Sequence, residues 1–244
     1  MDSSTIEYGA AERVENFNNR EGDYKYGPCD KCRGRGEIAR LRDGEFTVGQ
    51  CDCAIHYWSI VRAKQAGMGG VYDIFTMENY LAPRDWQRHL KLKAEEYIDG
   101  RTGWFFLCGQ SGSGKSHLTC AIAREMLEAG KKVRYMRWRQ DAPQLKALVN
   151  ERDEYDRRMK DLTGADVLVI DDLFKGKVTE ADINLAFEII DARYNRPKSM
   201  TVISSERDMP EILDIDEAVG GRIAERARGF TLKTGNENLR LADG

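Results

Sequence analysis

The chain has 244 residues, a formal net charge of −3 and 32% charged residues. This length is sufficient for one α/β domain and a smaller module, and the charge balance excludes a protein that binds nucleic acid through a global positive field. Because no apolar run of about 18 residues occurs and the first residues are polar, we expect a cytoplasmic protein that has no membrane partner.

The first predicted element is a small metal-binding module near the N-terminus. Cys29 and Cys32 form a C-x-x-C pair, and Cys51 and Cys53 follow after a segment of β-hairpin length. Four thiolates are a ligand set for structural Zn²⁺, and cysteines in a reducing compartment favour metal binding over disulfides. The sequence therefore predicts one zinc ion here. Unliganded thiols, or His56 in place of one cysteine, are the alternatives.

A glycine-rich break near residue 70 divides this module from the rest of the chain. After it, strands and helices alternate, which predicts an α/β fold built on a parallel sheet. We therefore assign residues 1–70 to the zinc-binding module and residues 71–244 to a second domain. The strands predicted for this domain cover residues 103–108, 132–136, 166–171, 200–204 and 230–233.

The first of these strands leads into a loop that fits G-x-x-x-x-G-K-[ST] at every fixed position. Its predicted nucleotide-binding residues are Gly109, Gln110, Ser111, Gly112, Ser113, Gly114, Lys115, Ser116 and the adjoining His117. Backbone N–H groups of such a loop and of the following helix bind phosphates. Lys115 would reach the β- and γ-phosphates, and the Ser116 hydroxyl would ligate Mg²⁺. The pattern predicts an ATP site, with an ordinary Gly/Ser loop as the alternative.

Two acidic residues end the third predicted strand of the second domain. Asp171 and Asp172 follow four apolar residues, which is the Walker B pattern. Asp171 would hold Mg²⁺ through water, and Asp172 would orient or deprotonate the attacking water. The alternative is a helix cap after a core strand, but the phosphate-binding loop favours the catalytic interpretation.

Together with the stretches 191–195 and 220–226, these motifs resemble the AAA+ ATPases of bacterial replicative-helicase loaders, the DnaC/DnaI type. The resemblance covers about residues 70–244. It implies a P-loop NTPase with a parallel sheet in the order 5-1-4-3-2, helices on both faces and no helical lid. It also implies an ATP-dependent loader that places a replicative DNA helicase on single-stranded DNA during replication initiation, with the zinc module as helicase-binding region. Transposition ATPases of the IstB type share the motifs and are the alternative; a P-loop kinase is disfavoured by the arginines described next.

The resemblance assigns further roles residue by residue. Ser205 matches the sensor that reads the γ-phosphate, and Glu206 follows it where loaders usually have Asn. Arg222 resembles the arginine finger that reaches the ATP of a neighbouring subunit, and Arg226, one turn later, is the competing choice. Arg240 matches a C-terminal arginine that approaches the nucleotide. The implied assembly is an ATP-bound ring or spiral with weak hydrolysis in the isolated subunit.

DNA contact is expected from two consecutive segments of the second domain. Basic residues alternate with aromatic ones over residues 131–139, which suits phosphate contact and base stacking. Residues 140–161 form a charged helical stretch that the resemblance places near single-stranded DNA. The alternative is a solvated helix with mixed ion pairs.

Overall fold

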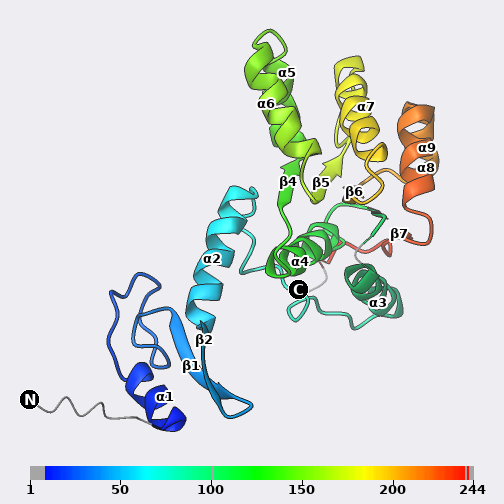
Figure 1. Ribbon diagram of the computed structural model, residues 1–244. Coiled ribbons are helices and arrows are strands. Elements are labelled where there is room, and N and C mark those ends of the chain that lie inside the picture. Colours follow the sequence, from blue (N-terminus) through cyan, green and yellow to red (C-terminus); the bar gives the residue numbers. More distant parts are fainter. Residues whose placement is uncertain (1–8, 101, 240, 242–244) are drawn as a thin grey trace, which may run out of the picture. The chain divides into compact units, whose positions relative to one another are not determined.

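The computed structural model describes residues 9–100, 102–239 and 241, and the chain forms two compact units (Figure 1). The first unit ends at Arg62 and the second begins at Ala63. The division falls within helix α2 (Asp52–Gln65). Residues 63–70, which the sequence analysis assigned to the zinc-binding module, therefore belong to the second unit.

The first unit is a β-hairpin with a helix packed on it. Its elements before α2 are α1 (Ala10–Asn18), β1 (Glu37–Arg42) and β2 (Glu45–Gln50). The hairpin turns through Asp43 and Gly44, whose positive φ angles of 52° and 83° are those of a two-residue primed turn. The Asn18 side chain donates to the Ala39 carbonyl and accepts from its N–H, at 3.0 and 2.9 Å, which attaches α1 to β1.

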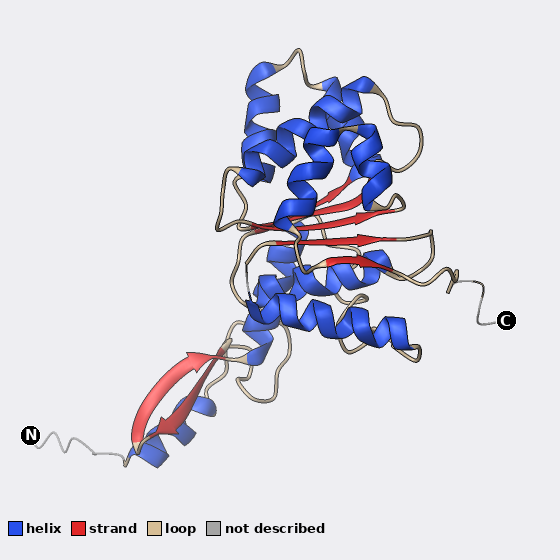
Figure 2. Ribbon diagram, turned by 90° about the vertical axis from the view of Figure 1, so that its right-hand side faces the viewer, coloured by secondary structure: helices blue, strands red, loops and turns tan. Residues whose placement is uncertain are grey.

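The second unit contains a five-stranded parallel sheet in the order β4-β5-β6-β3-β7 (Figures 1 and 2). Numbered within this domain, the order is 5-1-4-3-2, as predicted. The strands are β3 (Trp104–Cys108), β4 (Val133–Arg137), β5 (Val167–Leu173), β6 (Met200–Ser205) and β7 (Thr231–Lys233). All five predicted strands are confirmed, with ends that differ by at most two residues.

Helices cover both faces of this sheet, α3 and α4 on one side and α5 to α9 on the other (Figures 1 and 2). They are α3 (Asp85–Gly100), α4 (Lys115–Glu128), α5 (Trp138–Ala147), α6 (Arg152–Thr163), α7 (Glu180–Tyr194), α8 (Met209–Ile215) and α9 (Glu217–Arg226). The charged stretch 140–161 thus belongs to two helices, because the chain turns at residues 148–151.

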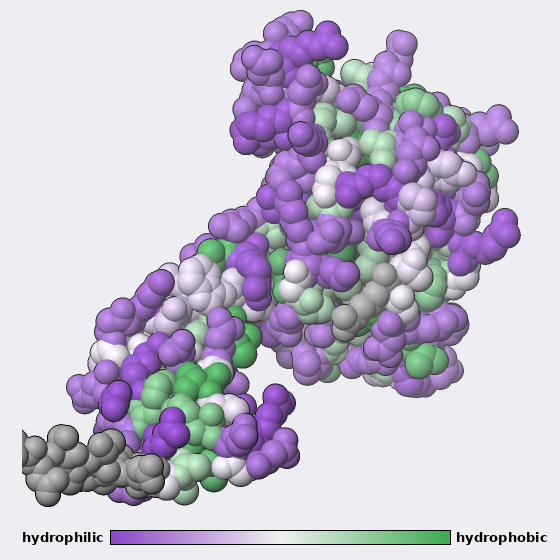
Figure 3. Space-filling view, viewed as in Figure 1, coloured by the Kyte–Doolittle hydropathy of each residue, from purple (hydrophilic) through white to green (hydrophobic). Residues whose placement is uncertain are grey.

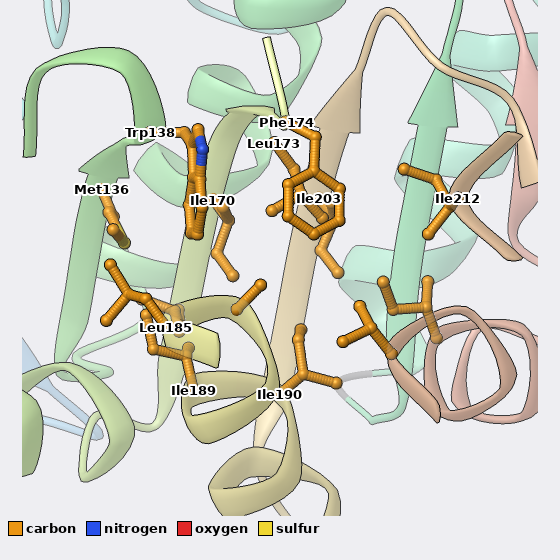
Figure 4. Packing of buried hydrophobic residues seen from close by; sticks show 14 of the residues in the cluster. Met136, Trp138, Ile170, Leu173, Phe174, Leu185, Ile189, Ile190, Ile203 and Ile212 are labelled. Carbon is orange, nitrogen blue, oxygen red and sulfur yellow. The ribbon is translucent and has the colours of Figure 1, made fainter. Parts of the chain in front are cut away.

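Apolar side chains of α7 pack against one face of the central strands (Figure 4). Ile189 and Ile190 are fully buried, as are Ile170 of β5 and Ile203 of β6. Since β3 and β5 are buried on both faces, β3 and the first four residues of β5 are continuous apolar runs rather than alternating ones. This sheet holds the carboxyl ends of its strands, and hence the loops that follow them, in fixed positions.

Arg193 connects the end of α7 to the starts of β5 and β6. Its guanidinium is fully buried and donates to the Thr201 hydroxyl at 3.2 Å. It also donates to four backbone carbonyls, those of Thr163, Ala165, Asp166 and Met200. Burial lowers the pKa of Arg193 to about 10. A residue of the 191–195 stretch is therefore part of the scaffold.

Replacing Arg193 with leucine is expected to lower the free energy of unfolding by about 3 kcal/mol or more, because buried carbonyls lose their donors. Lysine would also be a poor substitute, since a single ammonium cannot reproduce the planar fork of donors. Arg157→Leu is the matched control: this arginine is largely exposed, and its solvent-screened ion pair with Glu154 contributes little to stability. Equal urea unfolding midpoints for the two variants would contradict the assignment.

Candidate functional site

The glycine-rich loop joins β3 to α4 at the carboxyl edge of the sheet. The Gly109 N–H donates to the Ser205 carbonyl at 3.1 Å, which joins the start of the loop to the end of β6. Gly114 caps α4 with a φ of 90°, a left-handed conformation that glycine adopts without strain. The N-terminus of α4 therefore opens directly into the loop, as an anion site requires.

Lys115 lies at the base of a cavity of about 280 Å³ next to this loop. The cavity is lined by Phe75, Ser111, Gly112, Gly114, Lys115, Ser116, His117, Asp172, Lys175 and Leu239. The buried ammonium of Lys115 donates to the carbonyls of Gly109 and Gln110, at 2.8 Å each. Burial lowers the pKa of Lys115, and the nearby Asp172 and Glu206 carboxylates oppose that shift. Phosphate oxygens would be stronger acceptors for this ammonium than the two carbonyls.

The two residues predicted to hold Mg²⁺ lie in contact. The Ser116 hydroxyl donates to Asp171 Oδ1 at 3.0 Å, and the Ser204 hydroxyl donates to the same oxygen. Tyr135 donates its hydroxyl to Asp171 Oδ2 at 2.7 Å, and burial raises the pKa of Tyr135, so it remains a donor. This hydroxyl and carboxylate are oxygen ligands of the kind Mg²⁺ prefers. Tyr135 and Ser204, which flank Asp171 from the neighbouring strands β4 and β6, were not predicted as site residues.

Asp172 follows in a left-handed conformation, with a φ of 60°. Its carboxylate accepts from Lys175 Nζ at 2.8 Å, and the same ammonium lies 3.0 Å from Glu206 Oε1. Burial alone would raise the pKa of Glu206, but the contact with Lys175 and the positive charges of Lys175 and Lys115 together outweigh burial and lower this pKa. Sequence motifs gave no indication of Lys175, because its position depends on the turn that follows β5.

Ser205 and Glu206, at the end of β6, have different surroundings. The buried Ser205 hydroxyl donates to the Leu173 carbonyl at 2.8 Å and accepts from the Arg207 N–H at 3.1 Å. The Glu206 side chain instead lies near Ser111 of the glycine-rich loop, which helps to lower the pKa of Glu206. Glu206, rather than Ser205, therefore has the phosphate-binding loop among its neighbours. The sensor role of Ser205 stays a prediction.

An aromatic wall forms another side of the cavity. Phe75 stacks on His117 with ring centroids 4.9 Å apart, and a His117 ring nitrogen lies 3.0 Å from the Thr76 carbonyl. Burial lowers the pKa of His117, which favours the neutral ring. Such a surface suits contact with a nucleobase. Phe75 and Leu239 were not predicted, since they approach the loop from distant parts of the chain, and Arg240 lies outside the described residues.

The two arginines of α9 contact α7. Arg222 forms an ion pair with Asp191 at 2.8 Å, and its guanidinium lies 5.0 Å from the centre of the Phe187 ring. Arg226 donates to the Tyr194 carbonyl at 2.6 Å. Within the described part of the chain, neither arginine is among the residues that line the cavity at the glycine-rich loop.

The four predicted zinc ligands come together in the first unit. The Sγ atoms of Cys29, Cys32, Cys51 and Cys53 all lie within 4.8 Å of one another. Two of the distances are 3.7 and 3.4 Å, close to the edge of about 3.8 Å expected for a tetrahedral site with Zn–S bonds of about 2.3 Å. The Gly36 N–H points at Cys32 Sγ, 3.3 Å away. In the described ranges, His56 is not part of this group.

Very little apolar burial accompanies these cysteines. Among described residues of the first unit, the buried apolar side chains are Cys32, Ala39, Cys51 and Ala54. A unit of this size does not fold on such a core without a crosslink or a metal. The thiol geometry and the small core together fit a structural zinc ion, which Cys29, Cys32, Cys51 and Cys53 would hold.

The predicted DNA-contacting segment differs from expectation in its aromatic residues. Trp138 is 3% exposed and packs edge-on against Phe174, and Tyr135 is 7% exposed. Both are therefore core residues, so the expected base stacking on them is wrong. The tip formed by α5 and α6 is hydrophilic on the face shown in Figure 3. Its charges are partly paired, since Glu154 bridges Arg157 and Arg158.

No helix in the described ranges combines the length and the apolar character needed to cross a bilayer.

Comparisons with known proteins agree on one family for this chain. The family model described as IstB-like ATP binding protein matches residues 74–220, more than half of the chain.

Individual relatives support the same family. The phage-like element PBSX protein XkdC of Bacillus subtilis is 34% identical over 231 residues, covering 86% of this chain and 83% of XkdC. The replicative helicase loader DnaC of Escherichia coli is 27% identical over 170 residues, covering 67% of each protein. The uncharacterized protein YqaM of Bacillus subtilis is 33% identical over 142 residues, and the chain spans only 44% of its length.

Solved structures agree on the fold. The crystal structure of the DnaC helicase loader matches with a TM-score of 0.56 at 19% identity, covering 68% of this chain and 99% of that one. The predicted P-loop architecture is thereby confirmed. This chain belongs to the IstB/DnaC-like family of AAA+ ATP-binding proteins.

Proposed function

We propose that this chain is an ATP-dependent loader that places a replicative DNA helicase on single-stranded DNA. The observation that carries the proposal is the pairing of a DnaC-like nucleotide-binding unit with a separate four-cysteine unit. The relative DnaC is named a replicative helicase loader. The cysteine unit would dock the helicase, and the second unit would switch that contact with ATP.

The nucleotide site supplies each part of the proposed switch. Backbone groups of residues 109–116 and the Lys115 ammonium would bind the phosphates of ATP. Ser116 and Asp171 would hold Mg²⁺, whose charge offsets that of the phosphates. Asp172 would orient the attacking water, as the second acid of such sites does. The stacked Phe75 and His117 would contact the base.

Hydrolysis would require a second subunit. Arg222 and Arg226 do not line the cavity of their own chain among the described residues. We infer that ATP lies between neighbouring subunits of a ring or spiral and that one of these arginines reaches the neighbour's γ-phosphate. Single-stranded DNA would follow the assembly along α5 and α6, where the exposed Arg139 would contact phosphates.

A transposition helper of the IstB type is the second candidate. The family description itself and a match to an insertion sequence ATP-binding protein of Sinorhizobium fredii, 33% identical over 94 residues, favour it. Such a protein would assemble on DNA without a helicase. The cysteine unit is the feature that this candidate leaves without a role.

Co-purification with the replicative helicase of the same cell distinguishes the two candidates. The full-length chain should retain the purified helicase, and replacing both Cys29 and Cys32 with serine should abolish retention while ATP binding persists. Thr47→Ala, an exposed change on the hairpin, is the matched control and should retain helicase. Absence of any helicase complex for the unmodified chain, with or without ATP, would contradict the loader proposal.

A further inference from the structure

Lys175 is a cation at the nucleotide cavity that no known motif explains. It follows Asp172 by three residues and lines the cavity together with Lys115 and Ser116. Its ammonium lies 2.8 Å from Asp172 Oδ2 and 3.0 Å from Glu206 Oε1. An ammonium has three N–H donors, so beside these two carboxylates at least one donor is left for a bound anion.

The turn that carries Lys175 is fixed by its neighbours. Phe174 has a φ of 58° and packs edge-on against Trp138, with ring centroids 5.6 Å apart. The Arg207 guanidinium donates to the Phe174 carbonyl at 3.3 Å and to the Gly176 carbonyl at 3.2 Å. A left-handed phenylalanine persists only where the surroundings hold it. The backbone on both sides of Lys175 is therefore held at the cavity.

Glu206 makes a cation at this position necessary. Glu206 Oε1 lies 3.0 Å from the ammonium of Lys175, which lines the cavity, so an uncompensated negative charge there would repel a nucleotide's phosphates. Burial would lower the pKa of Lys175, but its bonds to Asp172 and Glu206 outweigh that effect and raise it. Lys175 thus stays charged and offsets Glu206.

We propose that Lys175 is a γ-phosphate ligand, supplied in cis, that makes the site distinguish ATP from ADP. The inference rests on the proposed ATP site and adds a residue to it. Asp172 is the acid expected beside the attacked phosphate, and Lys175 is paired with it, so a remaining donor of Lys175 would face the γ-phosphate. A γ-phosphate that accepts a hydrogen bond from Lys175 would weaken the pair between Lys175 and Asp172. The Asp172 carboxylate could then accept a hydrogen bond from water and orient it.

The test compares Mg·ATP and Mg·ADP binding by calorimetry for two variants of the same turn. Lys175→Gln should weaken ATP binding roughly ten- to a hundredfold, as expected for loss of a hydrogen bond to a charged group. ADP binding should change by less than about threefold, since ADP lacks the γ-phosphate. Lys177→Gln removes an exposed cation two residues away that does not line the cavity, and should leave both affinities unchanged. Unaltered ADP binding also shows that the Lys175 variant is folded.

Adding Glu206→Gln separates direct contact from charge compensation. The double variant should recover part of the lost ATP affinity, because the unpaired carboxylate is removed, but not all of it. Complete recovery, or equal weakening of ATP and ADP in Lys175→Gln, would overturn the assignment of Lys175 as a γ-phosphate ligand. Lys115→Ala tests the site itself: it should lose both nucleotides, and unchanged binding there would overturn the proposed function rather than this inference alone.

Discussion

Replacing Arg222 with alanine is expected to reduce DNA-stimulated ATP hydrolysis by about 10³- to 10⁵-fold, the range found for loss of an arginine finger. ATP affinity should change little, because Arg222 does not line its own chain's cavity among the described residues. In the single chain the guanidinium is paired with Asp191, so in the proposed assembly it would exchange this partner for a neighbour's phosphate. Steady-state hydrolysis and equilibrium binding, measured on the same preparation, separate the two effects.

Mixing this variant with Lys115→Ala tests whether the site is shared. Lys115→Ala subunits should bind no nucleotide but carry the arginine, whereas Arg222→Ala subunits should bind ATP but lack it. Some interfaces of a mixed assembly would then be complete, and activity should reappear at intermediate ratios. A mixture that is inactive at every ratio would contradict the shared site. Normal activity of Arg222→Ala with an inactive Arg226→Ala would instead move the finger one turn along α9.

Removal of zinc is expected to unfold the first unit. Structural zinc contributes on the order of 10 kcal/mol or more to the folding of small modules, and the described part of this unit buries few apolar side chains besides its cysteines. Elemental analysis should give one zinc per chain, and the Cys29→Ser, Cys32→Ser double variant should contain none. Its hairpin amides should lose protection from hydrogen exchange, while the second unit continues to bind ATP.

Cys108→Ala is the control for that experiment. Cys108 lies at the end of β3, outside the four-cysteine group, so this variant should keep its zinc. A preparation that is free of metal and yet shows a fully protected hairpin would refute the zinc assignment.

The sheet and the phosphate-binding loop could be predicted because short, local patterns encode them. The apolar run before Gly109 and the run before Asp171 each define a buried strand, and fixed residue spacings identify the loop and the acidic pair. Paired cysteines likewise indicated their cluster, since a hairpin returns the second pair to the first.

The cavity walls depend instead on tertiary packing. Phe75 and Leu239 reach the loop from segments far apart in the chain, and no periodicity connects them to it. Trp138 resembles a base-stacking residue in an exposed basic stretch, yet it belongs to the core because α5 begins directly at the end of β4. Lys175 faces the site because Asp172 and Phe174, in the turn that precedes it, adopt left-handed conformations.

Helicase loading onto covalently closed single-stranded DNA circles tests the loader proposal most directly. A closed circle has no end for a hexameric helicase to thread, so stable association requires that its ring be opened or assembled around the strand. Helicase should remain on the circles only when this chain and ATP are both present, and Lys115→Ala should abolish the transfer. Two results would contradict the loader proposal: helicase that loads equally well without the chain, or a chain that does not bind helicase and coats duplex DNA instead.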